Sequence, residues 1–202
     1  AALLLDYAGC GDSGGAFETQ TLESWRDDAL FLIGEQTEGP LLLVGSSMGG
    51  WLMLLVALAL IDRDGPGRVA ALVGIAAAPD FTDWGFDDAQ RAQMAAGETL
   101  YEANDYGPEP TPTTAAFWAS GQRNLLLDAA IAIDCPVRLL QGQNDTDVPF
   151  AAALRLADAL RSADVQTLLV KDGDHRLSRE PDLDLLCVTV DRLIEGHRRT
   201  RP

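Results

Sequence analysis

The chain has 202 residues, of which 47% are hydrophobic, so it is long enough to bury the core of one globular domain. Its 31 acidic and 15 basic residues leave a formal net charge of −16 at pH 7, which repels phosphate backbones, so we expect no nucleic-acid partner. The three cysteines are widely spaced and lack a C-x-x-C pair, which indicates neither a disulfide framework nor a zinc site and favours a reducing compartment.

Apolar runs bounded by turn signals predict five strands, at residues 1–5, 41–45, 69–76, 137–141 and 165–170. Most of the segments between these runs have a helical pattern. Between the first two runs, one helix is predicted by apolar residues that fall on one helical face: Leu22, Trp25, Ala29, Leu32 and Ile33. A last helix is expected from about Asp182 to Ile194, with a packing stripe of Leu183, Leu186, Val190 and Leu193. Strands that alternate with helices predict an α/β fold with a mostly parallel sheet.

The longest apolar stretch runs from Met48 to Ile61 and is shorter than the roughly 20 residues that a membrane span needs. We interpret this stretch as a helix buried behind the sheet, and we expect no membrane span. Because the chain starts without methionine inside an expected strand, its amino terminus gives no indication of targeting.

A candidate nucleophile follows the second apolar run. The motif G-S-S-M-G at residues 45–49 stands between that run and a helix-forming stretch, which is the context of a nucleophile elbow. A strand that turns sharply into a helix crowds the backbone, so we expect the motif to need glycine on both sides of the serine. The strained turn exposes the hydroxyl of Ser47, which is therefore the expected catalytic serine.

A nucleophilic serine needs a general base, and the chain has 2 histidines. His197 lies in a basic carboxy-terminal tail, where fraying makes it a poor base. His175 follows the last apolar run by a short turn, at the place where a base would stand at the carboxyl end of a strand. We therefore expect His175 to be the base.

The carboxylate that orients the imidazole should fall between the serine and the histidine in the chain. Asp145 does so, shortly after the fourth apolar run. Asp147 is the alternative, and both aspartates are also common turn formers. We favour Asp145. Asp172 and Asp174 are too close to His175 in sequence to orient its ring easily, and we expect them to shape the turn.

Residues 80–130 interrupt the alternation, with Pro108, Pro110 and Pro112 close together and no clear strand. We interpret this segment as a cap inserted over the site, within a single domain that spans residues 1–202. The aromatic side chains of the cap suit an apolar acyl or aryl group, although a small cap also needs aromatics for its own packing. They are Phe81, Trp84, Phe86, Tyr101, Tyr106, Phe117 and Trp118.

With an elbow serine, an acid after a later strand and a histidine after the last strand, the chain resembles the α/β-hydrolase superfamily. A closer likeness, to the group of the tenth abhydrolase-domain protein and its bacterial relatives, rests on residues 6–13, 45–54, 135–140 and 174–176. This resemblance implies an α/β-hydrolase fold, hydrolysis of thioesters and esters, and the roles of nucleophile for Ser47, acid for Asp145 and base for His175.

The same resemblance bears on substrate and compartment. The mitochondrial member of the group is an acyl-protein thioesterase and acyl-glucuronide esterase. An acyl-protein or small-molecule substrate with an apolar acyl group is therefore implied. The implied compartment is the cytoplasm in a bacterium or the mitochondrial matrix in a eukaryote.

Members of that group have further strands before the one expected at residues 1–5, and a loop after them whose backbone N–H completes the oxyanion hole. Nothing in this chain matches that part, so we expect an amino-terminally truncated sequence with a gap in the sheet between residues 1–5 and 41–45. The backbone N–H of Met48 would remain as one oxyanion donor, and loss of the other would lower turnover by about 10²–10³-fold.

These residues predict acyl transfer to water, in which Ser47, deprotonated by His175, attacks a thioester or ester carbonyl without a metal or organic cofactor. A serine aminopeptidase on the same fold is an alternative, in which cap carboxylates hold a substrate amine. The candidates for that role are Glu98, Glu102 and Asp105, although acidic residues in a chain of this charge more often form a solvated face. A non-catalytic binding module that keeps the fold is a further alternative.

Overall fold

The computed structural model describes residues 1–103 and 110–200. The chain forms two compact units, each made of two segments. The first unit contains Ala1–Thr37 and Asp80–Leu125, and the second contains Glu38–Pro79 and the chain from Leu126 onward.

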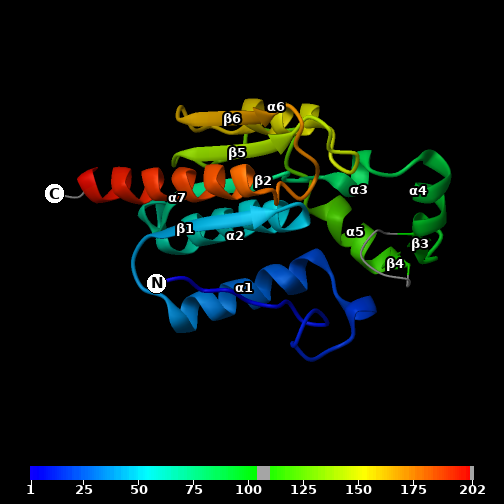
Figure 1. The fold of residues 1–202 in the computed structure, drawn as a ribbon. Coiled ribbons are helices and arrows are strands. Elements are labelled where there is room, and N and C mark those ends of the chain that lie inside the picture. Colours follow the sequence, from blue (N-terminus) through cyan, green and yellow to red (C-terminus); the bar gives the residue numbers. More distant parts are fainter. Residues whose placement is uncertain (104–109, 201–202) are drawn as a thin grey trace. The chain divides into compact units, whose positions relative to one another are not determined.

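The second unit is built on a four-stranded parallel sheet (Figure 1). Its strands are β1 (Leu41–Ser46), β2 (Val69–Ile75), β5 (Val137–Gly142) and β6 (Val165–Val170), in the spatial order β1-β2-β5-β6. Four of the five expected strands are thereby confirmed. The strands are parallel, so their carboxyl ends lie at one edge of the sheet, and the turns that follow them share that edge.

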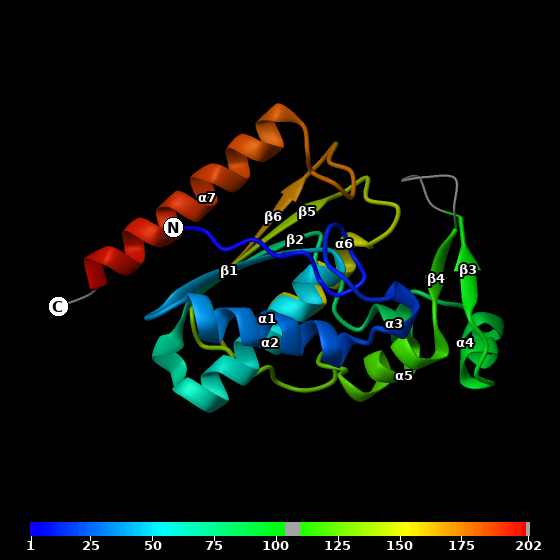
Figure 2. The same ribbon diagram turned by 90° about the horizontal axis from the view of Figure 1, so that it is seen from below.

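Helices cover both faces of this sheet, with α7 (Glu180–Thr200) on one side and α2 (Met48–Asp64) on the other (Figure 2). The helix α6 (Phe150–Ala159) packs against β5 and β6, and a 3-10 turn, η2 (Pro66–Arg68), precedes β2. The expected buried helix from Met48 to Ile61 is confirmed, because Trp51, Leu54 and Leu60 of α2 are 0% exposed. Among the helices of the described residues, none is long and apolar enough to cross a membrane.

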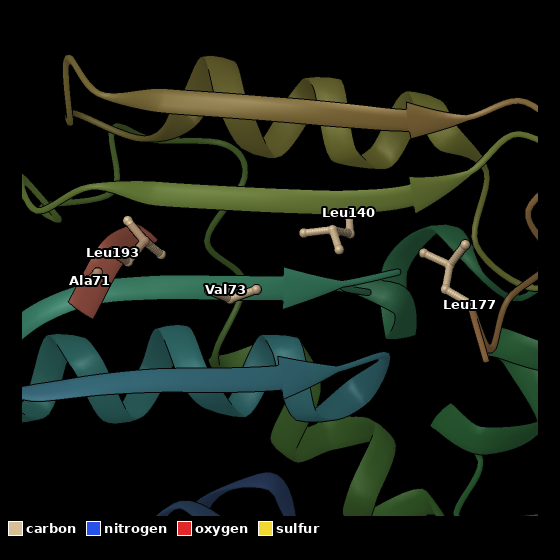
Figure 3. Close-up of a cluster of buried hydrophobic side chains, with 5 residues drawn as sticks. All are labelled: Ala71, Val73, Leu140, Leu177 and Leu193. Atoms are coloured by element: carbon tan, nitrogen blue, oxygen red, sulfur yellow. The ribbon is translucent and has the colours of Figure 1, made fainter. Parts of the chain in front are cut away.

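The α7 face of the sheet carries a cluster of buried side chains (Figure 3). Ala71, Val73, Leu140, Leu177 and Leu193 make up this cluster. Most of the expected stripe of α7 packs here, since Leu186 and Val190 lie against the cluster. The exception is Leu183, which is 47% exposed, because Leu185, in the second turn of the helix, packs against the cluster instead.

The first unit is mostly helical. It contains η1 (Phe17–Thr19), α1 (Leu22–Gln36), α3 (Phe81–Trp84), α4 (Asp88–Ala95) and α5 (Ala115–Arg123), together with the short strands β3 (Leu100–Glu102) and β4 (Thr111–Thr113). The expectation of no strand between residues 80 and 130 is wrong, because β3 and β4 pair antiparallel. Each has three residues, which is too short for a periodic pattern to be visible in the sequence.

The expected helix before β1 is confirmed as α1, whose first turn is capped by a reciprocal pair of hydrogen bonds between Thr21 and Ser24. Trp25 is the centre of its buried face and is 1% exposed. The indole ring lies 5.5–5.8 Å from the rings of Tyr7, Phe17 and Phe117, and its Nε1–H donates to the carbonyl of Ala8. The amino-terminal segment is therefore held to α1 and α5 inside the first unit.

The strand expected at residues 1–5 does not form, and that prediction is wrong. Leu4 is 92% exposed, and the following residues enter a turn in which the Cys10 N–H donates to the Tyr7 carbonyl. A strand needs a neighbouring strand for its backbone hydrogen bonds, and an apolar run does not supply one. In the described residues, no strand pairs with residues 1–5.

Aromatic residues of the expected cap pack largely on one another. Phe81 lies 6.2 Å from Phe86 and 5.9 Å from Phe117 between ring centres, and the indole of Trp118 donates to the carbonyl of Thr82. Tyr101 differs from these, being 63% exposed. Tyr106 and Pro108 lie outside the described residues.

Candidate active site

Ser47 stands at the sharp turn from β1 into α2, with φ 54° and ψ −125°. This positive φ is costly for a residue with a side chain, so the surrounding structure has to hold it. The end of β2 and the residues that follow it do so through two hydrogen bonds. The Ser47 N–H donates to the Ile75 carbonyl at 2.9 Å, and the Ala78 N–H donates to the Ser47 carbonyl at 3.0 Å.

Two glycines allow close packing at this turn, Gly45 between β1 and α2, and Gly50 between α2 and the segment after β2. A Cβ at Gly45 would collide with the carbonyl oxygen of Gly49, and one at Gly50 would collide with the side chain of Ala77. The expected need for glycine is therefore confirmed at Gly45. It is wrong at Gly49, because a Cβ on that residue would meet nothing within 4 Å, although the backbone carbonyl of Gly49 is what crowds Gly45.

His175 lies in the loop between β6 and α7. The loop is anchored two residues later by Leu177, which is 5% exposed and belongs to the cluster of Figure 3. Leu177 has φ 44°, and its N–H donates to Asp174 Oδ1 at 2.9 Å. The expected turn-shaping role of Asp174 is thus confirmed.

Asp145 lies in the loop that follows β5, and its side chain is 0% exposed. One carboxylate oxygen, Oδ1, accepts the backbone N–H groups of Asp147 at 2.9 Å and Val148 at 2.8 Å. The other oxygen, Oδ2, accepts from Gln141 Nε2 at 2.9 Å. These donors compensate for the loss of water around a buried carboxylate.

The loops that carry Asp145 and His175 are joined backbone to backbone. The Gln143 N–H donates to the Val170 carbonyl and the Asn144 N–H donates to the Gly173 carbonyl, both at 2.9 Å. A Cβ on Gly142 would collide with the carbonyl oxygen of Gly173. The close approach of the two loops therefore depends on glycine at position 142.

The structure brings Ser47, His175 and Asp145 together. His175 Nε2 lies 3.0 Å from Ser47 Oγ, and His175 Nδ1 lies 2.9 Å from Asp145 Oδ2. The histidine side chain is 15% exposed, so part of it remains accessible to solvent. Asp147 is placed differently, with its Oδ2 3.9 Å from Nε2 and its side chain 55% exposed.

This geometry has the form of a nucleophile, a base and an orienting acid in series. If the proton of neutral His175 is on Nδ1, facing the carboxylate, Nε2 is left to accept the proton of Ser47. The backbone N–H of Met48 belongs to the first turn of α2, whose N–H groups have no acceptor within the helix. In a nucleophile elbow, the N–H of this residue faces the developing oxyanion.

One residue of the site was not singled out in the sequence. Gln141 is 0% exposed and contacts Asp145 directly. A polar residue at an inward position of the apolar β5 was the signal that would have found it, since Val137 and Leu139 occupy the preceding alternate positions.

The acidic residues considered for binding a substrate amine belong to the first unit. Glu98 is exposed after α4, and Glu102 at the end of β3 lies 3.4 Å from Gln90 Nε2. Asp105 lies outside the described residues. In the part of the chain that the structure describes, no group of three or more His, Cys, Asp or Glu side chains is arranged to hold a metal ion.

Comparisons of this chain with known sequences all indicate the same family. A model of the alpha/beta hydrolase family matches residues 1–185. The mitochondrial palmitoyl-protein thioesterase ABHD10 of Mus musculus is 37% identical over 203 residues, covering 96% of this chain and 65% of that protein. The Homo sapiens protein of the same name is 36% identical over 201 residues, covering 96% and 63%. This chain thus spans less than two thirds of the length of these relatives.

Solved structures agree with this match. A putative hydrolase from Agrobacterium vitis S4 has a TM-score of 0.87 at 41% identity, covering 94% of this chain and 74% of that one. Mouse alpha/beta hydrolase domain-containing protein 10 has a TM-score of 0.84 at 36% identity, covering 95% and 76%. The predicted α/β-hydrolase fold is thereby confirmed.

Proposed function

The chain belongs to the alpha/beta hydrolase family, and we propose that it is a serine hydrolase that cleaves carboxylic thioesters or esters through an acyl-enzyme on Ser47. The observation that carries this proposal is the 3.0 Å contact between Ser47 Oγ and His175 Nε2 on a strained strand-to-helix turn. The name of the relatives, palmitoyl-protein thioesterase, supports an acyl substrate.

In the first half of the reaction, Ser47 Oγ attacks the acyl carbonyl carbon while His175 Nε2 takes the hydroxyl proton. The carbonyl oxygen becomes an oxyanion, which accepts the Met48 N–H. Asp145 stabilises the imidazolium through the hydrogen bond at Nδ1. The tetrahedral intermediate then expels the thiol or alcohol, which receives its proton from Nε2, and leaves the acyl group on Ser47.

In the second half, water replaces the leaving group. His175 Nε2 takes a proton from the water, whose oxygen attacks the acyl-enzyme carbonyl. Collapse of the second intermediate releases the carboxylic acid and returns the proton to Ser47 Oγ. The protein side chains supply each proton transfer, so the cycle closes without a further group.

The proposed substrate has an apolar acyl chain on a protein thiol or on a small molecule. This proposal is supported by the name of the relatives and by a nucleophile whose attack requires an activated carbonyl. For a chain of eukaryotic origin, the same relatives support a mitochondrial compartment.

The first test is labelling with a fluorophosphonate, followed by mass spectrometry of the peptides. A fluorophosphonate reacts with a serine that a neighbouring base activates, so we expect an adduct on Ser47 and none in Ser47→Ala. Ser46→Ala is the matched control, because it removes the adjacent hydroxyl and should leave the labelling of Ser47 intact. An unlabelled wild-type protein that is folded by circular dichroism would contradict the proposal.

Substrate class is tested by comparing an acyl thioester, a carboxylic ester and a peptide amide of the same acyl group. Thioester and ester hydrolysis should be abolished in Ser47→Ala, with a loss of about 10⁴-fold or more. Preferential cleavage of the amide would instead favour an aminopeptidase. Binding of all three without turnover by the wild-type protein would favour a non-catalytic binding module.

A further inference from the structure

A glutamine is buried at the carboxyl end of β5, beside the proposed acid. Gln141 is 0% exposed, on a strand whose other buried side chains are apolar. An amide taken out of water without hydrogen bonds is costly, so a buried glutamine needs partners. The hydrogen-bond partners of Gln141 therefore indicate why this buried position holds an amide and not an apolar side chain.

The amide nitrogen of Gln141 faces three acceptors. It donates to Asp145 Oδ2 at 2.9 Å, to the Val148 carbonyl at 3.1 Å and to the Gly142 carbonyl at 3.2 Å. Because all three acceptors are oxygen atoms, the opposite orientation of the carboxamide would place its own oxygen against them. The site therefore requires a donor at this position.

Gln141 binds a different oxygen of the Asp145 carboxylate from the one that the backbone donors bind. The backbone N–H groups of Asp147 and Val148, in the loop after β5, both donate to Asp145 Oδ1. Oδ2, the oxygen that His175 contacts, is bound by Gln141, and both of these contacts are 2.9 Å long. With the Asp145 side chain 0% exposed, bulk water does not replace a lost donor at Oδ2.

We infer that Gln141 is a positioning residue for Asp145, an inference that rests on the proposed function of the site. Donation from the end of a core strand fixes the rotation of the Asp145 carboxylate and keeps Oδ2 aligned with the Nδ1–H of His175. That alignment holds the imidazole tautomer in which Nε2 accepts the Ser47 proton. The contact with Val148 ties the same amide to the loop that carries the acid.

The test variant is Gln141→Met, which keeps the length of the side chain and removes both amide donors. We expect kcat to fall about 10–100-fold while KM is unchanged, because Gln141 acts through Asp145 and not on the substrate. The matched control is Thr189→Val in α7, which removes another buried side-chain hydrogen bond, from Thr189 Oγ1 to the Leu185 carbonyl, and should leave kcat unchanged. A Gln141→Met variant with wild-type kcat, or with a raised KM alone, would overturn the inference.

The hydrogen bond itself is measured in the resting protein by nuclear magnetic resonance with ¹⁵N-labelled histidine. The chain has 2 histidines, so His197 serves as an internal reference. At a pH where His175 is neutral, we expect its proton on Nδ1 with a downfield resonance in the wild type, and a mixture of tautomers with a weakened downfield signal in Gln141→Met. Wild-type signals in the variant would overturn the inference.

This measurement needs no substrate, so it separates the two proposals. A wild-type protein that hydrolyses no ester would contradict the proposed function, while the tautomer of His175 still tests the role of Gln141. If Gln141→Met does not fold, the wild-type protein labelled with ¹⁵N-glutamine gives the answer. The Gln141 side-chain amide protons should exchange slowly with solvent, and exchange at the rate of an exposed glutamine would overturn the inference.

Discussion

At the scale of single residues, the two aspartates beside His175 have different environments. Asp145 is buried and contacts Nδ1, whereas Asp147 is 55% exposed and stands 3.9 Å from Nε2. An orienting acid must bind the nitrogen that faces away from the nucleophile. This geometry favours Asp145 for the role. The sequence also favoured Asp145 but kept Asp147 as the alternative, because both follow β5 within a few residues.

Replacement of each aspartate by asparagine tests which of Asp145 and Asp147 orients His175. Asp145→Asn should lower kcat by about 10⁴-fold, because the amide favours the wrong histidine tautomer, and Asp147→Asn should change it by less than about tenfold. Steady-state hydrolysis of a soluble ester gives both values. Equal losses in the two variants would contradict the assignment of Asp145.

The glycines at the turn from β1 into α2 form a second matched pair. Gly45→Ala forces a Cβ against the Gly49 carbonyl and should lower the free energy of unfolding by about 1–3 kcal/mol. Gly49→Ala meets open space within α2 and should raise it by up to about 1 kcal/mol, because alanine favours the helix more than glycine does. Urea denaturation measures both changes. Destabilisation of similar size at both positions would contradict the conclusion that the backbone is crowded at Gly45 and open at Gly49.

At the scale of secondary-structure elements, the loop that carries His175 is positioned by the packing of Leu177 beneath it. Leu177→Ala should lower the free energy of unfolding by about 2–5 kcal/mol, since it removes buried atoms from the cluster of Figure 3. Leu183→Ala, on the exposed side of α7, should change it by less than about 0.5 kcal/mol. Denaturant titrations of both variants test this difference, and a mild effect of Leu177→Ala would show that the loop is held by other contacts.

The first turn of α7 contains a carboxylate with a perturbed pKa. Hydrogen bonds from the Arg179 guanidinium, which lies 2.7 Å from Asp182 Oδ2, lower the pKa of Asp182 from its ordinary value of 3.8. A lowered pKa in the folded state stabilises the protein above the unfolded-state value, and this contribution is lost as the pH falls through the folded-state value.

The variant Asp182→Asn does not titrate, so it should unfold at a lower temperature than the wild type at pH 7. The sign of the linkage requires this difference to persist down to about pH 4 and to shrink below it, as Asp182 becomes protonated. Thermal unfolding followed by circular dichroism at pH 7, 5 and 3 measures the difference. A gap that stays constant at pH 3 would show that the charge of Asp182 is not its source.

At the scale of the whole molecule, the net charge of −16 destabilises the folded state, because the excess acidic side chains repel one another. Added sodium chloride screens this repulsion, so raising the ionic strength from about 10 mM to about 0.15 M should raise the melting temperature by a few degrees. Differential scanning calorimetry measures the shift. A melting temperature that falls with salt would indicate that attractive ion pairs outweigh the net repulsion.

The sheet and most helices were predictable from the sequence for local reasons. The runs that form β1, β2, β5 and β6 are apolar and bounded by turn residues. The strand β2 ends at Ile75, one residue before its expected end, because Ala76 adopts φ 45°. The failures have a common cause. The strand at residues 1–5 depended on a partner, and β3 and β4 have three residues each, so neither case was decided by local pattern.

The residues at the carboxyl ends of the strands could be read from local pattern, because the motif around Ser47 and the turns before Asp145 and His175 are local features. The contact of Asp145, and not Asp147, with His175 Nδ1 is a tertiary feature, because it depends on how the loops after β5 and β6 approach each other at Gly142 and Gly173. The contact between Gln141 and Asp145 likewise comes from tertiary structure, since only a folded strand shows what a buried amide contacts.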